Sequence, residues 1–144
     1  MAKDLIHDMV VKALDNDGWK ILEEEFNISY KELEIYVDIV AERKPILIEK
    51  GDQKIIVEVK SFIGRSFMRD LQQALGQYEL YYTIMESLDM DYELYLGIGS
   101  EVYLDYFVRE ATNEVIQKYK LNLLVVDLEN KQVIKWLKQK SIKN

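Results

Sequence analysis

The chain has 144 residues, of which 49% are hydrophobic, and this is a usual size for one domain with its own core. No apolar run approaches the roughly 18 residues of a membrane span, and the first residues lack the basic start and long apolar stretch of a signal peptide. The absence of cysteine excludes disulfides and thiolate zinc sites, and a net charge of −7 argues against strong, independent binding to nucleic acid. We therefore expect one cytoplasmic domain over residues 1–144, with no membrane attachment.

The first part of the chain predicts one helix followed by several strands. Apolar residues recur at the helical period over residues 3–17, and Gly18 follows as a helix stop. Runs rich in β-branched and aromatic residues then predict strands, with a hairpin turn at residues 51–53. The last of these strands should be central, because its apolar run is nearly continuous. The expected strands are residues 19–26, 33–41, 46–49 and 54–60.

The second part alternates helices with strands. Ser66 is a suitable N-cap for a long helix that ends near Leu88. Its expected apolar stripe is Phe67, Leu71, Leu75, Tyr78, Tyr82 and Met85. A strand at 94–98, a helix at 103–119 and strands at 121–127 and 132–137 complete the chain. This order predicts an α/β fold with a central mixed sheet covered by helices on both faces.

Three charged residues lie inside apolar strand patterns. Glu58 and Lys60 are two residues apart and so share one face of their strand, and Asp38 lies within its own apolar strand. If the two strands are neighbours, both carboxylates and Lys60 converge. Mg²⁺ takes carboxylate oxygens together with water and phosphate oxygens, and a nearby lysine can stabilise charge on a phosphate. An ordinary edge strand with an ion-paired, exposed face is the alternative explanation of this pattern.

Other polar residues extend the candidate site. Gln73, Gln77 and Tyr81 lie four residues apart on the predicted helix, on a face expected to lie away from the apolar stripe. They could steady a phosphate or a lysine, or they could form a solvated helix face. His7 is the only histidine, and packing or helix capping competes with a role at the cleft. Asp4, one turn before it, could edge the same cleft.

Several sequence blocks, in the same order, resemble the XisH family, the fdxN-element excision controlling factors of cyanobacteria. The resemblance extends over nearly the whole chain. The blocks are Ala-Lys-Asp-Leu-Ile-His (2–7), Val-Asp-Ile-Val-Ala-Glu (37–42), Lys-Ile-Ile-Val-Glu-Val-Lys-Ser-Phe (54–62), Gln-Ala-Leu-Gly-Gln-Tyr (73–78), Leu-Leu-Val-Val-Asp (123–127) and Val-Ile-Lys-Trp (133–136).

The resemblance implies a restriction-endonuclease-like fold of the PD-(D/E)XK type, with an α-β-β-β-α-β core. It implies that Asp38 and Glu58 hold Mg²⁺ or Mn²⁺, that Lys60 is the catalytic lysine and that Gln77 is a helix-borne partner. Val37 stands where that motif often has proline, and Glu49 competes with Asp38 as the first acid, because the stretch between Asp38 and Glu58 is long.

Two functions follow from these observations. The first is a Mg²⁺-dependent nuclease-like protein that acts on DNA during excision of a DNA element, together with a second protein, XisI. The second is a catalytically silent module that regulates recombination by binding a partner, which the acidic charge favours. The oligomeric state stays open, with a homo-oligomer among the alternatives.

Overall fold

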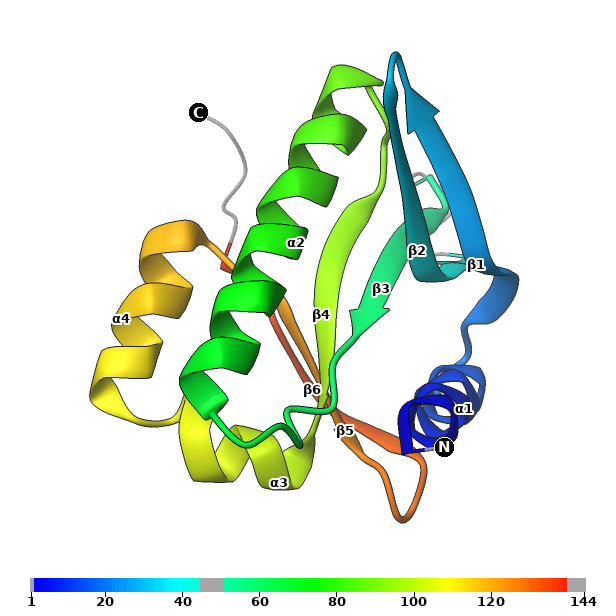
Figure 1. Ribbon diagram of the computed structural model, residues 1–144. Helices are drawn as coiled ribbons and strands as arrows, with labels where there is room; N and C mark the ends of the chain where they lie inside the picture. The colour runs from blue at the N-terminus through cyan, green and yellow to red at the C-terminus, as the bar shows by residue number, and fades with distance from the viewer. Residues whose placement is uncertain (1, 45–50, 140–144) are drawn as a thin grey trace.

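The computed structural model describes residues 2–44 and 51–139, and within these ranges it describes side chains from Leu5 onward. In these described ranges, six strands and four α-helices follow one another, with a π-helical segment, η1, after the shortest helix (Figure 1). The elements are α1 (Ala2–Asn16), β1 (Lys20–Tyr30), β2 (Leu33–Arg43), β3 (Gln53–Val59), α2 (Phe67–Ser87), β4 (Glu93–Gly99), α3 (Ser100–Val102), η1 (Tyr103–Phe107), α4 (Glu110–Tyr119), β5 (Leu123–Asp127) and β6 (Gln132–Leu137).

All six strands form one mixed sheet in which each strand pairs with the next strand of the chain. The β1, β2 and β3 strands are antiparallel, β3, β4 and β5 are parallel, and β5 and β6 are antiparallel. The parallel pairs need crossovers, which α2 supplies between β3 and β4, and α3 to α4 between β4 and β5. The predicted mixed sheet, the central place of β3 and the α-β-β-β-α-β order at the start of the chain are confirmed.

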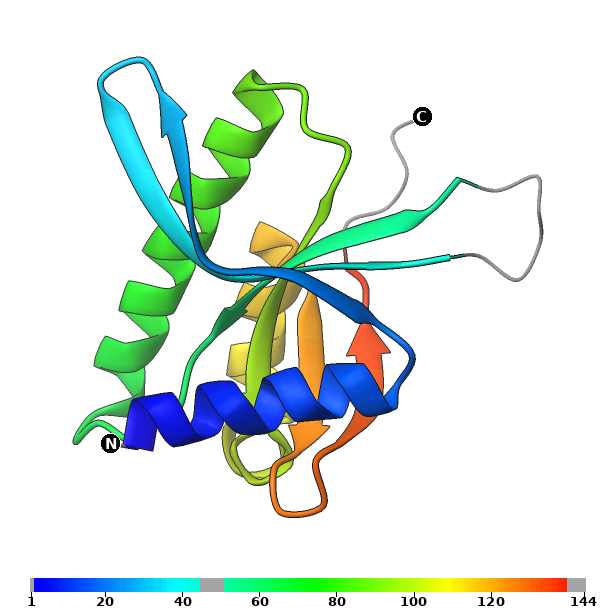
Figure 2. The ribbon, with the colours of Figure 1, turned by 90° about the vertical axis from the view of Figure 1, so that its right-hand side faces the viewer.

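Helices cover both faces of the sheet, so there are two apolar cores. One core joins the sheet to α2 and α4, and the other joins it to α1 (Figures 1 and 2). Side chains of β2 contribute to both cores: Ile35 and Val37 pack with the α2 side, whereas Ile39 and Ala41 pack with the α1 side. Asp38 therefore lies where β2 passes from one core to the other.

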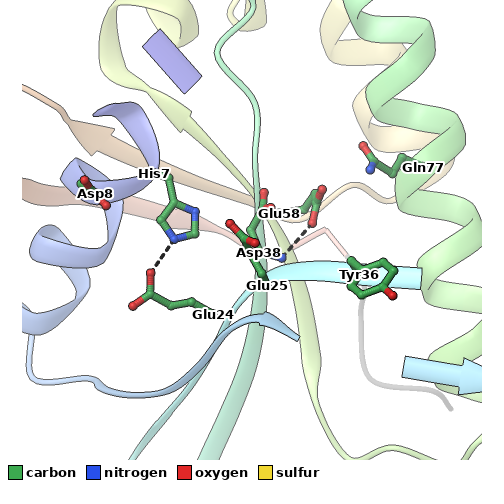
Figure 3. Close-up of a pocket in the computed structure, with 8 residues that line it drawn as sticks. All are labelled: His7, Asp8, Glu24, Glu25, Tyr36, Asp38, Glu58 and Gln77. Carbon is green, nitrogen blue, oxygen red and sulfur yellow. Dashed lines mark hydrogen bonds and ion pairs between the residues drawn. The ribbon is translucent and has the colours of Figure 1, made fainter. Parts of the chain in front are cut away.

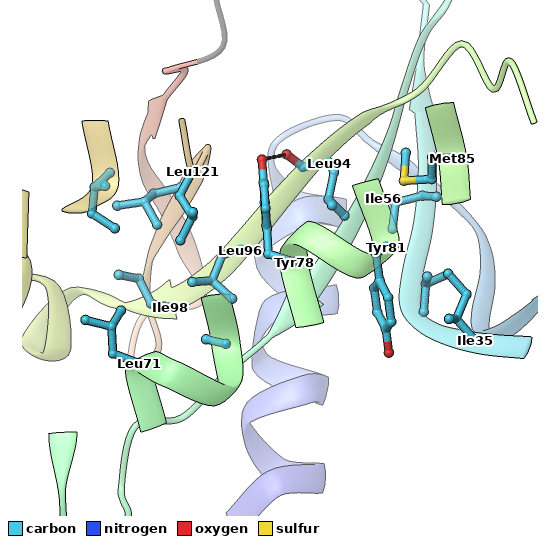
Figure 4. Close-up of a cluster of buried hydrophobic side chains, with 14 of the residues drawn as sticks. Ile35, Ile56, Leu71, Tyr78, Tyr81, Met85, Leu94, Leu96, Ile98 and Leu121 are labelled. Carbon is cyan, nitrogen blue, oxygen red and sulfur yellow. Dashed lines mark hydrogen bonds between the residues drawn. The ribbon is translucent and has the colours of Figure 1, made fainter. Parts of the chain in front are cut away.

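The long helix α2 is fixed at its start and along its buried face. Ser66 is its N-cap, as predicted, and its hydroxyl accepts a hydrogen bond from the amide of Arg69. Tyr78 is 1% exposed, and its hydroxyl donates to the carbonyl of Leu94 in β4, as Figure 4 shows. The same hydroxyl accepts from the amide of Asn122, so a buried polar network ties α2 to β4 and to the start of β5.

One predicted strand lies outside the described residues, and one predicted helix needs correction. The predicted strand 46–49 lies outside the described residues, and the antiparallel partner of β3 is β2, with Arg43 opposite Gln53. The predicted helix 103–119 is divided, because Arg109 adopts an extended backbone between η1 and α4. No glycine or proline marks this break, so the apolar pattern alone did not reveal it. Among the described residues, no helix combines the length and apolar character that a membrane span requires.

Candidate functional site

Asp38 and Glu58 meet across the junction of β2 and β3. Ile39 is opposite Val57 and Val40 is opposite Ile56, so the same register places Asp38 opposite Glu58, on one face of the sheet. Two strand acids that are 20 positions apart in sequence therefore become neighbours. The sequence analysis expected the two carboxylates to converge if their strands were neighbours, and β2 and β3 are paired.

Each of the two carboxylates accepts a hydrogen bond from backbone beside the other. Asp38 Oδ2 accepts from the amide of Val59 at 2.8 Å, and Glu58 Oε1 accepts from the amide of Asp38 at 3.2 Å. These contacts and the short reach of an aspartate side chain place the two carboxylates within about 8 Å of each other. Amide donors stabilise ionised carboxylates, and Glu58 is only 5% exposed. The two carboxylates thus accept hydrogen bonds from backbone amides at the point where the backbone pairing of β2 with β3 ends.

A cavity of about 590 Å³ opens above this pair (Figure 3). Four elements line it: α1, the β1–β2 hairpin, β3 and α2. The lining residues are His7, Asp8, Glu24, Glu25, Tyr36, Asp38, Glu58 and Gln77. Five carboxylates face one imidazole in this set, so the cavity attracts cations and repels phosphate unless a cation is present.

The α1 and β1 side of the cavity contains residues that sequence reasoning did not identify as site residues. His7, which the sequence analysis named as a candidate, lines the cavity, and its Nε2 lies 2.7 Å from Glu24 Oε1. Glu25 has a φ of 51°, which is unusual for a residue other than glycine. On β1 it lies between the two residues that pair with the β2 neighbours of Asp38, Val37 and Ile39. The acidic run at residues 23–25 was the available signal, but it does not indicate which carboxylate turns toward the cavity. The sequence likewise did not indicate that Asp8 lines the cavity.

On the α2 side, Gln77 and Tyr81 form one hydrogen-bonded unit. Gln77 Nε2 donates to the Tyr81 hydroxyl at 2.8 Å, and that hydroxyl donates to the carbonyl of Tyr36 at 3.0 Å. A carbonyl can only accept, so the single phenolic proton goes to Tyr36 and Gln77 must present its NH₂ group to Tyr81. Gln77 Oε1 consequently remains an acceptor at the wall of the cavity.

The predicted position of Tyr81, on a face of α2 away from the apolar stripe, was wrong. Tyr81 is 7% exposed and packs in the α2-side core, whereas the sequence placed it away from the apolar stripe. The buried face of α2 is wider than the predicted stripe and includes Ala74 and Ile84. Burial raises the pKa of Tyr81, and the nearby Glu58 carboxylate raises it further, with a smaller contribution from Asp38. The hydrogen bond from Gln77 opposes this rise.

Lys60 lies one residue beyond β3, and its amide donates to the carbonyl of Gly97. It lines a second hollow of about 210 Å³, together with Asp70 and Gln73, rather than the cavity of the two acids. Within the described chain, its ammonium group makes no ion pair within 4.0 Å. The side chains of Asp4 and Glu49 lie outside the described part, so their predicted roles stay predictions.

The donor set suits a weakly held Mg²⁺ rather than a closed metal centre. Among the described residues, no group of three or more histidine, cysteine or acidic side chains is arranged to hold a metal ion. Mg²⁺, however, is commonly bound through one or two carboxylates and completes its shell with water and phosphate oxygens. Asp38 and Glu58 match this mode, and Asp38 Oδ1 has no hydrogen-bond partner in the described structure.

Comparison with known proteins identifies the family of this chain. The family model described as XisH protein matches residues 1–134. The chain belongs to the XisH family. An XisH family protein from Nostoc punctiforme has a similar crystal structure, with a TM-score of 0.83, 30% identity and coverage of 92% of this chain and 98% of that one. An fdxN element excision controlling factor protein from Anabaena variabilis is similar at a TM-score of 0.82, with 31% identity and coverage of 93% and 98%. No protein with a curated description matches this XisH-family chain.

Proposed function

We propose that this XisH-family protein is a nuclease-like protein, dependent on Mg²⁺ or Mn²⁺, that hydrolyses DNA phosphodiesters. The observation that carries the proposal is the Asp38–Glu58 pair, held face to face on two central strands at the floor of a cavity. The α-β-β-β-α-β order supports a restriction-endonuclease-like fold for this arrangement. Two neighbouring carboxylates repel each other, and a bound divalent cation would relieve this repulsion.

The roles proposed for the side chains follow from their positions. Asp38 and Glu58 would hold the divalent ion, which would supply polarisation of a phosphoryl oxygen and acidification of a water molecule. Lys60 stabilises charge that develops on the phosphate, from the hollow next to the acids. Gln77 accepts a hydrogen bond from the attacking water through Oε1, and Tyr81 holds the amide in that orientation.

The biological setting proposed for the protein is excision of a DNA element in the cytoplasm. One structural relative is an fdxN element excision controlling factor protein, and we extend this role to the present chain. A second, XisI-like protein is the proposed partner. A chain with a net charge of −7 is repelled by DNA, so a partner that carries positive charge would assist contact with DNA.

The second candidate is a catalytically silent module that regulates recombination through its partner. The acid-rich lining of the cavity favours it, because five carboxylates disfavour the approach of a phosphate when no metal is bound. In that case the XisI-like protein, or a second copy of this chain, would bind the folded surface and no DNA would be cut.

Incubation of DNA with this chain and the XisI-like protein, with and without MgCl₂ or MnCl₂, distinguishes the two functions. The nuclease proposal expects metal-dependent cleavage that Asp38→Asn abolishes. Cleavage that persists in Asp38→Asn indicates a contaminating nuclease. Intact DNA under all conditions, together with a stable two-protein complex, would favour the silent module.

A further inference from the structure

Two hollows beside α2 are lined by residues that neighbour one another in the chain. Glu58 lines the acidic cavity and the next residue, Val59, lines the second hollow. On the facing helix, Gln77 lines the first and Gln73, one turn earlier, lines the second. Residues four apart share a helix face, so the next member of this row is Arg69. The row thus leads from the acidic cavity toward the start of α2.

The charge along this row changes sign. Residues 59–69 contain Lys60, Arg65 and Arg69 and no acidic residue, within a chain whose net charge is −7. Arg65 and Arg69 are exposed and Lys60 is half-buried. None of these three cations has an ion-pair partner within 4.0 Å in the part of the chain that the structure describes. Asp70 is the nearest acid in sequence and also lines the second hollow, where its carboxylate accepts a hydrogen bond from the Gly64 amide.

The segment that presents these cations is held firmly against the fold. Phe62 is 8% exposed and packs on Phe67 and Phe107, with ring centroids 5.5 Å and 5.3 Å away. At Gly64, an added Cβ would lie 2.6 Å from Asp70 Oδ1, so the backbone approaches the helix as closely as glycine allows. Packing therefore fixes the backbone from which the three cations extend.

We infer that Arg65 and Arg69, with Lys60, form a phosphate-binding track that leads a DNA strand into the Asp38–Glu58 cavity from the N-terminal end of α2. The inference rests on the proposed function, because the phosphodiester beyond the track is the one that would be cut. Gln77 and Arg69 are eight residues apart, about 12 Å along the helix axis, so the track extends beyond the length of a single phosphate group.

The test is binding of a fluorescent single-stranded oligonucleotide and its duplex, measured in EDTA so that no metal-dependent cleavage occurs, across a range of salt concentrations. Two phosphate contacts to a single strand contribute about 1.4 to the slope of log affinity against log salt. We expect the Arg65→Gln/Arg69→Gln double variant to lose about this slope and to bind about 10- to 100-fold more weakly at low salt. Lys20→Gln/Lys118→Gln, which removes two exposed cations from β1 and α4, is the matched control and should bind as the parent does.

Unchanged affinity and slope in the double variant would overturn the inference, as would a parent chain that binds neither probe at low salt. Loss of the XisI-like partner in the double variant, with oligonucleotide binding retained, would also overturn it, because the cations would then serve a protein surface. Stabilisation of the parent by MgCl₂, and its loss in Asp38→Asn, reports on the proposed function separately. The track can therefore fail while the metal site stands.

Discussion

Two substitutions at Asp38 separate the effect of its hydrogen bond on the stability of the fold from the effect of its charge. The Asp38 carboxylate accepts the Val59 amide at 2.8 Å, and Val59 is 7% exposed, so water cannot easily replace this acceptor. Asp38→Asn keeps an oxygen that can accept the same hydrogen bond but removes the charge. Asp38→Ala removes both. Comparison of the two variants therefore isolates the hydrogen bond.

The expected magnitudes follow from the geometry. A buried amide left without an acceptor destabilises a fold by about 1–3 kcal/mol. Two carboxylates about 8 Å apart repel by about 2 kcal/mol at an effective dielectric constant of 20, and the partial exposure of Asp38 reduces this value. Asp38→Asn should thus be as stable as the parent or more so. Asp38→Ala should fall below Asp38→Asn by about 1–3 kcal/mol, or roughly 3–9 °C in Tm for a domain of this size.

Thermal unfolding with and without MgCl₂ measures both effects. Magnesium at ten times its Kd stabilises the parent by about 1.4 kcal/mol through mass action, and neither variant should show this gain. Equal stability of Asp38→Asn and Asp38→Ala would refute the role of the Val59 hydrogen bond. A full magnesium gain in Asp38→Asn would refute Asp38 as a metal ligand.

Three further changes test other parts of the site and its support. Lys60→Ala should keep the stabilisation by MgCl₂ but lose metal-dependent DNA cleavage, and a variant that still cuts DNA would exclude Lys60 from the chemistry. Tyr81→Phe should lower Tm by roughly 3–6 °C, because loss of its hydroxyl removes two hydrogen bonds worth about 1 kcal/mol each. The control is Tyr119→Phe at an exposed position. An equal loss of Tm in the control would contradict this explanation. Burial raises the pKa of Tyr78 above its ordinary value of 10.0, so its contribution to stability is complete below that pH and is lost as the pH rises further. Urea unfolding on both sides of this pH should show a steeper alkaline loss in the parent than in Tyr78→Phe, and parallel losses would show that another group titrates.

Local sequence patterns were sufficient for most elements of the fold. The Ser66 cap, the helical period of α1 and the apolar run of β3 each specify an element from neighbouring residues, and the structure confirms all three. The break at Arg109 was not predictable in this way. It follows from an extended backbone at that residue, whose guanidinium lies over the Tyr106 ring, and neither feature has a glycine or proline signal.

The candidate site depends on pairings between distant residues, and sequence indicates these less well. Asp38 and Glu58 stood out because a charge inside an apolar strand is unusual. Their direct opposition, however, comes from the β2–β3 register, which no local pattern specifies. Asp8 and Glu25 resemble ordinary surface acids in sequence, and only the crossing of α1 over β1 brings both to the same cavity. Tyr81 was misplaced because the buried face of α2 is wider than a single apolar stripe.

The arrangement of these residues determines which of them can distinguish a nuclease from a silent module. Asp38 and Glu58 also complete the hydrogen bonding of the strand backbone, so the fold would favour their retention even after catalysis had been lost. Tyr81 is likewise held by packing and by the Tyr36 carbonyl. Within the described chain, the side chain of Lys60 has no hydrogen bond or ion pair that the fold requires, yet it occupies the hollow next to the two acids. Lys60 is therefore the position at which a substitution would separate the two proposed functions, because a phosphate ligand would give its ammonium group a role that the fold does not require.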